Sequence, residues 1–365
     1  MKKIISVLTC LCFVVHAGAH TGVVKTANPK SDNEKKVVVV KPKLKVVTTI
    51  SALASVASAI GKDLIEINAL SLASEDPHFV KAKPTFKKWV SEADVFLQVG
   101  RSLELWVPLV INSSSNKKLI SGERLVSVSD GVYVLEAPKS LDRGAAGDIH
   151  PQGNPHIWLS PVAVLKVAEN IKNAFSKADA QHAPQYEKNY IEFKLLLSKA
   201  MFGEELVKAS GNVDFLWRLQ QGNRLKAYLV KNKKQPGGWL KSAQSIDYKF
   251  LTYHSELSYL AHDFGLNIVG HVEEKSGVAP SARYQNELIK KSKENHLKHI
   301  VAATYYAGNS KLLENIAKSI GGSKIFIQVD CSKGESYIAM MDRIIQSLVK
   351  FRGAMQALPN AVHIQ

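Results

Sequence analysis

From Lys45 onward the chain alternates between short apolar runs and longer segments whose apolar residues recur every three or four positions. Short runs rich in β-branched residues are typical of strands, and the longer periodic segments are typical of amphipathic helices. In the first part of the chain, strands are expected at residues 45–50, 64–71, 94–100 and 124–129. Helices are expected between them at residues 51–63, 84–93 and 102–112.

The same alternation returns in the last third of the chain. Strands are expected there at residues 248–253, 267–272, 298–304 and 324–329, and helices at residues 281–296 and 310–322. Strict alternation of strand and helix implies βαβ units and parallel sheets. The sequence therefore predicts an α/β fold with two lobes, each a parallel sheet flanked by helices.

The region between the lobes has helical spacing without strands, over residues 161–179 and 183–210. Pro184 suits the first turn of the second helix. A helix of about 25 residues spans roughly 37 Å, which is long enough to brace two lobes. We therefore expect an N-terminal lobe over residues 46–183, one connecting helix over 184–210 and a C-terminal lobe over 211–365. Within the C-terminal lobe, residues 211–244 are expected to form a helical extension that ends at a glycine turn.

The first residues have the order of a secretory signal peptide. Lys2 and Lys3 precede an apolar run that is too short to span a bilayer comfortably, and small residues follow at 17–19. Cleavage is expected after Ala19, which leaves a basic, poorly ordered leader over residues 20–45. No later segment is long and apolar enough to cross a membrane.

Charge and cysteine content narrow the picture further. The formal net charge is +16 at pH 7, and basic proteins often bind nucleic acids or anionic membranes. Here the lysines are scattered and no nucleic-acid-binding motif is present, so a nucleic-acid partner is not expected. After loss of the signal peptide only Cys331 remains, so stability must come from a core rather than a disulfide. We expect Cys331 to be a buried, inert thiol.

Candidate chemistry is concentrated at strand ends and in one proline-rich loop, "GDIHPQGNPHIWLSP", residues 147–161. Ligands of parallel sheets bind at the carboxyl ends of the strands. His78 lies in a loop after a strand, His254 and Asp330 each follow a strand directly, and His156 lies in the proline loop. Imidazole and carboxylate bind zinc and other divalent transition metals, and neighbouring prolines lower the ordering cost of binding.

These positions are far apart in the sequence and lack a short metal motif such as HExxH or CxxC, so spacing alone leaves ordinary structural histidines as the alternative. His150, six residues before His156, is a candidate for a supporting or auxiliary ligand. Changing it to alanine is expected to preserve most of the metal affinity. Three tryptophans are interpreted as packing residues: Trp106, Trp158 and Trp239.

Several blocks of the chain resemble one known family, the zinc and manganese substrate-binding proteins of metal-importing ABC transporters. The blocks follow the family's order over about residues 46–350 and include "EDPHFVKAKPTFKKWVSEADVFLQVGRSLELWV", "GDIHPQGNPHIWLSP", "PQYEKNYIEFKLLL", "LTYHSELSYLAHDFGLNIVG" and "EKSGVAPSARYQNELI". The resemblance implies two α/β lobes joined by one long helix, with a metal ion in the cleft. It places the family's metal-binding histidines on His78, His156 and His254.

The fourth ligand is less well marked by the resemblance. The family's late carboxylate falls near Asp330, with Gln328, Glu335 and water as alternatives. The loop rich in histidine and acidic residues that is common in zinc importers is absent. Where relatives often carry a glutamate after the strand at 298–304, this chain has Ala302 and Ala303.

These observations predict a monomeric periplasmic protein that captures zinc and delivers it to the membrane permease of an ABC importer. Three imidazoles and one oxygen favour zinc, whereas manganese prefers more oxygen ligands. A manganese or iron protein of the same type is one alternative. A zinc-dependent hydrolase with an open three-histidine site is another, with Glu256 as its only nearby candidate for a general base. A metal-dependent adhesin or a simple metal buffer is a further alternative. We expect no enzymatic activity.

Overall fold

The computed structural model describes residues 42–137, 150–273 and 277–356. The expected signal peptide, 1–19, and nearly all of the leader, 20–45, lie outside the described residues. The chain forms two units, residues 1–43 and residues 44–365, and the fold below is that of the second unit. Among its described helices, none combines the length and apolar character that a membrane span requires.

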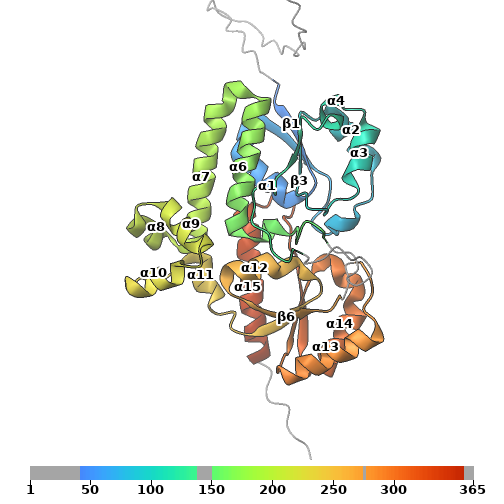
Figure 1. The fold of residues 1–365 in the computed structure, drawn as a ribbon, viewed down its shortest axis with the longest axis vertical. Coiled ribbons are helices and arrows are strands. Elements are labelled where there is room, and N and C mark those ends of the chain that lie inside the picture. The colour runs from blue at the N-terminus through green and yellow to red at the C-terminus, as the bar shows by residue number, and fades with distance from the viewer. Residues whose placement is uncertain (1–41, 138–149, 274–276, 357–365) are drawn as a thin grey trace, which may run out of the picture. The chain divides into compact units, whose positions relative to one another are not determined.

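The first sheet has four parallel strands in the order β2-β1-β3-β4 (Figure 1). The strands are β1 Leu44–Thr48, β2 Ile65–Ala69, β3 Val95–Gln98 and β4 Leu125–Ser127. The helices of this part are α1 Ser51–Gly61, α2 Pro84–Glu92, α3 Val107–Ser114 and α4 Lys117–Ile120. All four strands expected from the sequence are present.

The second sheet repeats this arrangement in the order β6-β5-β7-β8, again entirely parallel. Its strands are β5 Lys249–Thr252, β6 Asn267–His271, β7 His299–Ala303 and β8 Ser323–Ile327. Its helices are α12 Ser258–Phe264, α13 Ala282–Glu294, α14 Ser310–Ser319 and α15 Tyr337–Gln356. Two parallel sheets flanked by helices confirm the predicted fold class.

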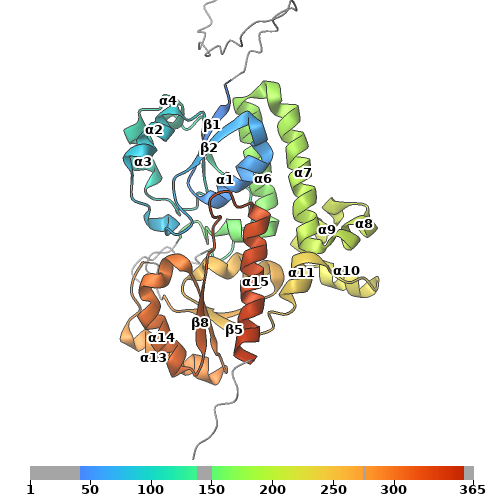
Figure 2. The ribbon, with the colours of Figure 1, turned by 180° about the vertical axis from the view of Figure 1, so that it is seen from behind.

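Four of the described helices were misplaced or missed by the sequence reasoning, and two of the missed ones are the short helices α4 and α12. The helix expected from Ser102 begins only at Val107, because Arg101 and Ser102 have φ of 53° and 62°, outside the right-handed helical region. The C-terminal helix α15 was not expected. Figure 2 shows it beside β8, and it also contacts α1 and α11.

The middle of the chain is helical, as expected, but its long helix is interrupted. The helices are α6 Pro161–Ala178, α7 Ala183–Phe202, α8 Glu204–Ser210, α9 Val213–Gln221, α10 Leu225–Lys231 and α11 Gly238–Ala243. Figures 1 and 2 both show α6 and α7 side by side. The single helix expected over 184–210 is therefore two helices.

The break between α7 and α8 lies at Gly203, whose φ of 85° belongs to the left-handed region. At the same point the chain of Gly237 and Gly238 passes against the end of α7. A Cβ atom on Gly238 would collide with the carbonyl of Ala200. The glycine turn expected at Gly237 and Gly238 lies at this close approach and leads into α11. The lobe boundaries, 46–183 and 211–365, remain predictions.

The core runs without interruption from one sheet to the other. One cluster of buried apolar side chains contains Val46 of β1, Ile171 of α6, Leu197 of α7, Phe250 of β5 and Leu348 of α15. A smaller cluster, including Phe86 and Val90 of α2, covers the other face of the first sheet. Because interiors are close-packed, the shared cluster ties both sheets to α6 and α7.

Candidate metal centre

His78 is positioned by the residue two places before it. It lies in a 3₁₀ turn, Pro77–Phe79, in the loop after β2. Asp76 Oδ1 accepts a hydrogen bond from the backbone N–H of His78 (3.0 Å) and lies 2.7 Å from Nδ1 of its ring. A carboxylate can only accept, so Nδ1 carries the ring proton and Nε2 presents a lone pair.

His156 is held by the same device, with an amide in place of the carboxylate. Asn154 Oδ1 accepts from the backbone N–H of His156 (2.9 Å) and lies 2.8 Å from its Nδ1. The amide of Asn154 is oriented by its Nδ2, which donates to the carbonyl of Ser255 (2.9 Å). His156 therefore also presents Nε2 as a lone pair, and this atom is buried without a hydrogen-bond partner.

His254 directly follows β5 and is buried. Its Nδ1 lies 2.9 Å from Glu273 Oε2, without the alignment of a hydrogen bond. Its backbone N–H donates to Glu256 Oε2 (3.1 Å). As in His156, the Nε2 atom is buried and has no hydrogen-bond partner.

The three histidines converge on one point between the two sheets. One ring nitrogen from each lies within 4.8 Å of the others, and their ring centroids are 5.1 to 5.5 Å apart. Leaving a buried nitrogen unpaired costs about 1–3 kcal/mol, and two such atoms face each other here. A divalent cation would satisfy these lone pairs, so the side chains fit a metal ion.

Burial favours the neutral form of two imidazoles at this point, those of His156 and His150. Burial, followed by the neighbouring imidazoles, lowers the pKa of His156 well below its ordinary value. Burial also lowers the pKa of His150 to about 3. Metal binding requires neutral imidazole, so the folded chain keeps these ligands ready near neutral pH.

Asp330, the expected fourth ligand, has its carboxylate engaged elsewhere. Oδ1 accepts from the backbone N–H groups of Ala52 (2.6 Å) and Cys331 (2.8 Å), and Oδ2 accepts from that of Ser51 (3.2 Å). Ser51 and Ala52 begin α1 of the other sheet. Burial raises the pKa of Asp330 to about 6 despite these bonds. Within the described residues, the group of converging ligand atoms does not include this carboxylate.

The alternatives to Asp330 are also engaged. Gln328 Nε2 donates to Ser332 Oγ (2.7 Å), and Glu335 pairs with Arg343 at 2.9 Å. His150 shows the opposite behaviour, because its Nε2 lies 3.3 Å from Nε2 of His78. The structure thus places His150 beside His78, in keeping with its candidacy for a supporting or auxiliary ligand.

The sequence reasoning also missed the side chains that lie against Nδ1 of the three rings, namely Asp76, Asn154 and Glu273. A signal for two of them was present. Both "DPH" and "NPH" place a short oxygen acceptor two residues before a histidine, where its side chain reaches both the backbone N–H and Nδ1 of that histidine. No comparable local pattern marks Glu273.

Comparison with known proteins gives the family of the chain. A family model described as the periplasmic zinc-uptake complex component A, ZnuA, matches residues 46–200 and 223–351. The chain belongs to this family. The two parallel sheets are therefore the fold of a member of this family, and the histidine cluster between them is its candidate metal site.

Individual relatives are distant. The zinc-binding lipoprotein AdcA of Streptococcus pneumoniae is 25% identical over 95% of this chain, which spans 60% of that protein's length. The high-affinity zinc uptake system protein ZnuA of Bacillus subtilis is 24% identical, over 84% of this chain and 86% of that protein. The structure of the periplasmic zinc-binding protein TroA from Treponema pallidum matches with a TM-score of 0.62 and 18% identity, over 85% of this chain and 99% of that one. This last likeness concerns the fold.

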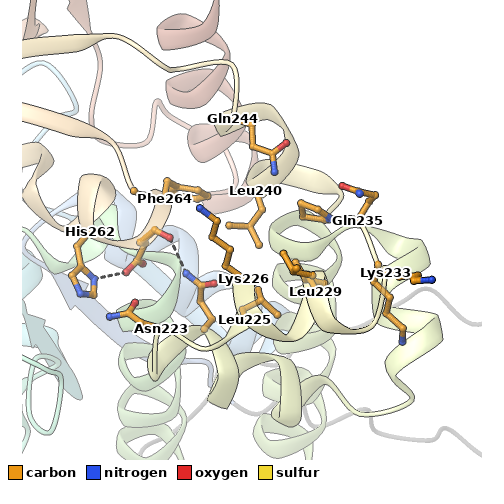
Figure 3. A pocket seen from close by; sticks show the side chains of 16 residues that line it. Asn223, Leu225, Lys226, Leu229, Lys233, Gln235, Leu240, Gln244, His262 and Phe264 are labelled. Atoms are coloured by element: carbon orange, nitrogen blue, oxygen red, sulfur yellow. Dashed lines mark hydrogen bonds and ion pairs between the residues drawn. The ribbon is translucent and has the colours of Figure 1, made fainter.

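A separate cavity of about 830 Å³ lies beside α10 and α11 (Figure 3). It borders residues 201–222, the segment that the family model does not match. Its lining combines apolar residues with lysines and contains none of the clustered histidines; it includes Leu225, Lys226, Leu229, Lys233, Lys234, Leu240 and Phe264. The cavity is thus distinct from the candidate metal centre.

Proposed function

We propose that this protein captures zinc outside the cytoplasm and delivers it to the permease of an ABC importer. The observation that carries the proposal is the convergence of His78, His156 and His254, two of which present buried, unpaired Nε2 atoms. Membership of the zinc-uptake family supports the same cargo. The printed names of the relatives AdcA and ZnuA support it as well.

Zinc is favoured over manganese and iron by the donor set. The converging atoms are imidazole nitrogens, which suit zinc, whereas manganese favours carboxylate, carbonyl and water oxygens. The nearest carboxylates, Asp76 and Glu273, lie against the Nδ1 atoms on the outer side of their rings. They orient ligands in this proposal and do not bind the ion themselves.

Transport without catalysis is the second part of the proposal. A hydrolase would need a general base beside the metal-bound water. Glu256, the only candidate for that base named from the sequence, instead accepts from the backbone N–H groups of His254 (3.1 Å) and Ala303 (3.3 Å). Burial raises the pKa of Glu256 to about 8. This carboxyl group supports the backbone around the ligand rather than facing substrate.

Location and partners complete the proposal. The expected signal peptide and the lipoprotein and periplasmic descriptions of the relatives support export. We place the mature chain in the periplasm as a monomer whose partner is a membrane permease. Deleting the gene in its native host should impair growth under zinc chelation, and the parent gene should restore it. A gene carrying His254→Ala should not.

The direct test is native mass spectrometry with elemental analysis of protein purified without added metal. One zinc ion per chain is expected. Alanine at His78, His156 or His254 should each weaken binding by at least about 100-fold, equivalent to about 2.7 kcal/mol. His296→Asn is the matched control, since His296 is exposed and its φ of 56° suits asparagine. Parental affinity in any two of the three alanine variants would refute the site.

A further inference from the structure

A fourth imidazole, that of His150, lies beside the three converging histidines, outside the group whose ligand atoms all lie within 4.8 Å of one another. The ring of His150 stacks on that of His78 with centroids 5.2 Å apart. Its centroid is 6.0 Å from that of His156 and 6.1 Å from that of His254. All four rings therefore surround one small volume, although His150 precedes the family's N-P-H motif by several residues.

The distance between one ring nitrogen of His150 and one of His78 matches that between two nitrogen ligands of a zinc ion. In a tetrahedral zinc site with Zn–N bonds of about 2.0–2.1 Å, two nitrogen ligands lie about 3.3–3.4 Å apart. Nε2 of His150 and Nε2 of His78 are 3.3 Å apart. This pair already has the spacing of one edge of a zinc tetrahedron.

The proton arrangement allows both nitrogens to serve as ligands. Asp76 fixes the ring proton of His78 on Nδ1, so Nε2 of His78 is an acceptor. Without metal, Nε2–H of His150 can donate to that acceptor across the 3.3 Å gap. When a cation binds, His150 changes tautomer, so that its one ring proton stands on Nδ1 and its Nε2 is free to bind the ion. Both Nε2 lone pairs then face the ion.

The backbone around His150 is anchored by hydrogen bonds on the residues that follow it. The N–H of Gly153 donates to the carbonyl of His150 (2.9 Å), in a turn where Gly153 has a φ of 83°. Nη1 of Arg101 donates to the carbonyl of Gln152 (3.0 Å). The N–H of Asn154 donates to the carbonyl of Leu135 (2.9 Å). The ring is thus presented with little remaining ordering cost.

We propose that His150 is the fourth metal ligand and completes a shell of four imidazole nitrogens. The inference rests on the proposed function, and it assigns Asp330 to the support of α1 instead of to the ion. A shell of four nitrogens would be more selective than three imidazoles with a carboxylate, because manganese loses the oxygen donor that it prefers. His150 is therefore a specificity determinant for zinc against manganese.

The test compares the parent with His150→Ala and with the His296→Asn control. Zinc and manganese affinities are measured by competition with a chelating indicator, and zinc X-ray absorption counts the bound imidazoles. We expect four imidazoles in the parent and three plus one oxygen in His150→Ala. Zinc affinity should fall about 10- to 100-fold, while manganese affinity changes less than about threefold. Thermal unfolding of the metal-free variants checks that the fold is kept.

The outcomes separate this inference from the proposed function. If the parent binds one zinc through three imidazoles and His150→Ala matches it in affinity and ligand count, His150 is not a ligand and the transport function stands. If Asp330→Asn, and not His150→Ala, removes one ligand from the zinc spectrum, Asp330 is the fourth ligand. A parent that binds no zinc at all would refute the proposed function itself.

Discussion

The ends of β1 and β5 occupy the same place in two sheets of the same strand order, yet they are completed differently. After β5 stands His254, whose buried Nε2 has no partner. After β1 the chain enters α1 at Ser51, and the first backbone N–H groups of that helix point at Asp330. The end of β5 therefore presents a nitrogen lone pair that has no hydrogen-bond donor. The end of β1 presents backbone N–H donors that already have an acceptor in Asp330.

The difference separates buried nitrogens that have no hydrogen-bond donor from a carboxylate whose oxygens already accept hydrogen bonds. Asp330 follows β8 of the second sheet but closes the N-terminus of a helix on the first sheet, where a carboxylate is stabilised by the helix dipole and free N–H groups. The histidines at the other end gain nothing comparable from the protein. A cation would satisfy buried nitrogen acceptors that have no donor in the protein. Which acceptors lack a donor depends on tertiary contacts.

The largest expected effect removes the imidazole at the β5 end. His254→Ala should lower zinc affinity by at least about 100-fold, because one of three converging nitrogens is lost. The stabilisation that bound zinc gives should shrink by about 2.7 kcal/mol at the same free zinc concentration. Thermal unfolding with and without zinc measures this directly. An unchanged zinc-induced shift would mean that the unpaired Nε2 atom does not face the ion.

The matching change at the β1 end is Asp330→Asn, and it should act on stability instead of metal binding. An amide NH₂ placed toward the N–H groups of Ser51 or Ala52 leaves at least one of them without an acceptor. The free energy of unfolding of the metal-free protein should fall by about 1–3 kcal/mol. Zinc affinity should stay within about threefold.

Urea unfolding and zinc competition on the same preparation measure both quantities for Asp330→Asn. Glu335→Gln is a useful control, since it alters a nearby acid whose side chain bonds to Arg343 and Ser332. A tenfold or greater loss of zinc affinity in Asp330→Asn alone would restore the expectation that Asp330 binds the ion.

Much of the fold could be predicted because its signals are local. All eight strands appear near the expected residues, since β-branched apolar runs bounded by turn residues specify them. Pro84 and Pro184 mark the starts of α2 and α7 because proline fits a first helical turn. The break at Gly203 was missed, because the glycine is required by the approach of Gly237 and Gly238 from another part of the chain.

The site was predictable only in part, for the same reason. His78, His156 and His254 were chosen from their places at strand ends, in a proline loop and in family-like blocks, and the structure brings their rings together. Asp330 looked equivalent by position, but its partners belong to α1, about 280 residues earlier in the chain. His150 lacked a motif, and its closeness to His78 depends on contacts across 72 residues of sequence.

A smaller effect is expected from removing a side chain that orients a histidine ring. Asp76→Ala removes the group that orients His78 and should lower zinc affinity about tenfold, close to 1.4 kcal/mol. Asp76→Asn keeps an oxygen acceptor and should remain within about threefold of the parent. Isothermal competition titrations distinguish the two. Equal losses in both variants would point to the charge of Asp76, and not to its orientation of the ring, as the important property.

The smallest effect is the pH dependence of stability, because the buried histidines and Asp330 change the free energy of unfolding with opposite sign as the pH falls. The folded pKa of His150 is about 3 and that of His156 lies well below its ordinary value, so the unfolded chain binds these protons more tightly. Their stabilisation of the metal-free fold is complete above about pH 6.5 and is lost as pH falls. At pH 5.5 each of these two histidines should lower the free energy of unfolding by about 1 kcal/mol relative to pH 7.5.

Asp330 acts in the other direction, because its folded pKa is raised to about 6. It should raise the free energy of unfolding by about 1 kcal/mol between pH 7.5 and pH 5.5. Glu256, whose folded pKa is raised to about 8, acts in the same direction as Asp330 and opposes the histidines in the parent and in Asp330→Asn alike. Asp330→Asn should therefore respond to acidification from pH 7.5 to pH 5.5 less favourably than the chelator-treated parent, by about 1 kcal/mol, because one opposing contribution is gone. Urea unfolding at the two pH values gives both differences, and equal changes in the two proteins would show that folding does not raise the pKa of Asp330.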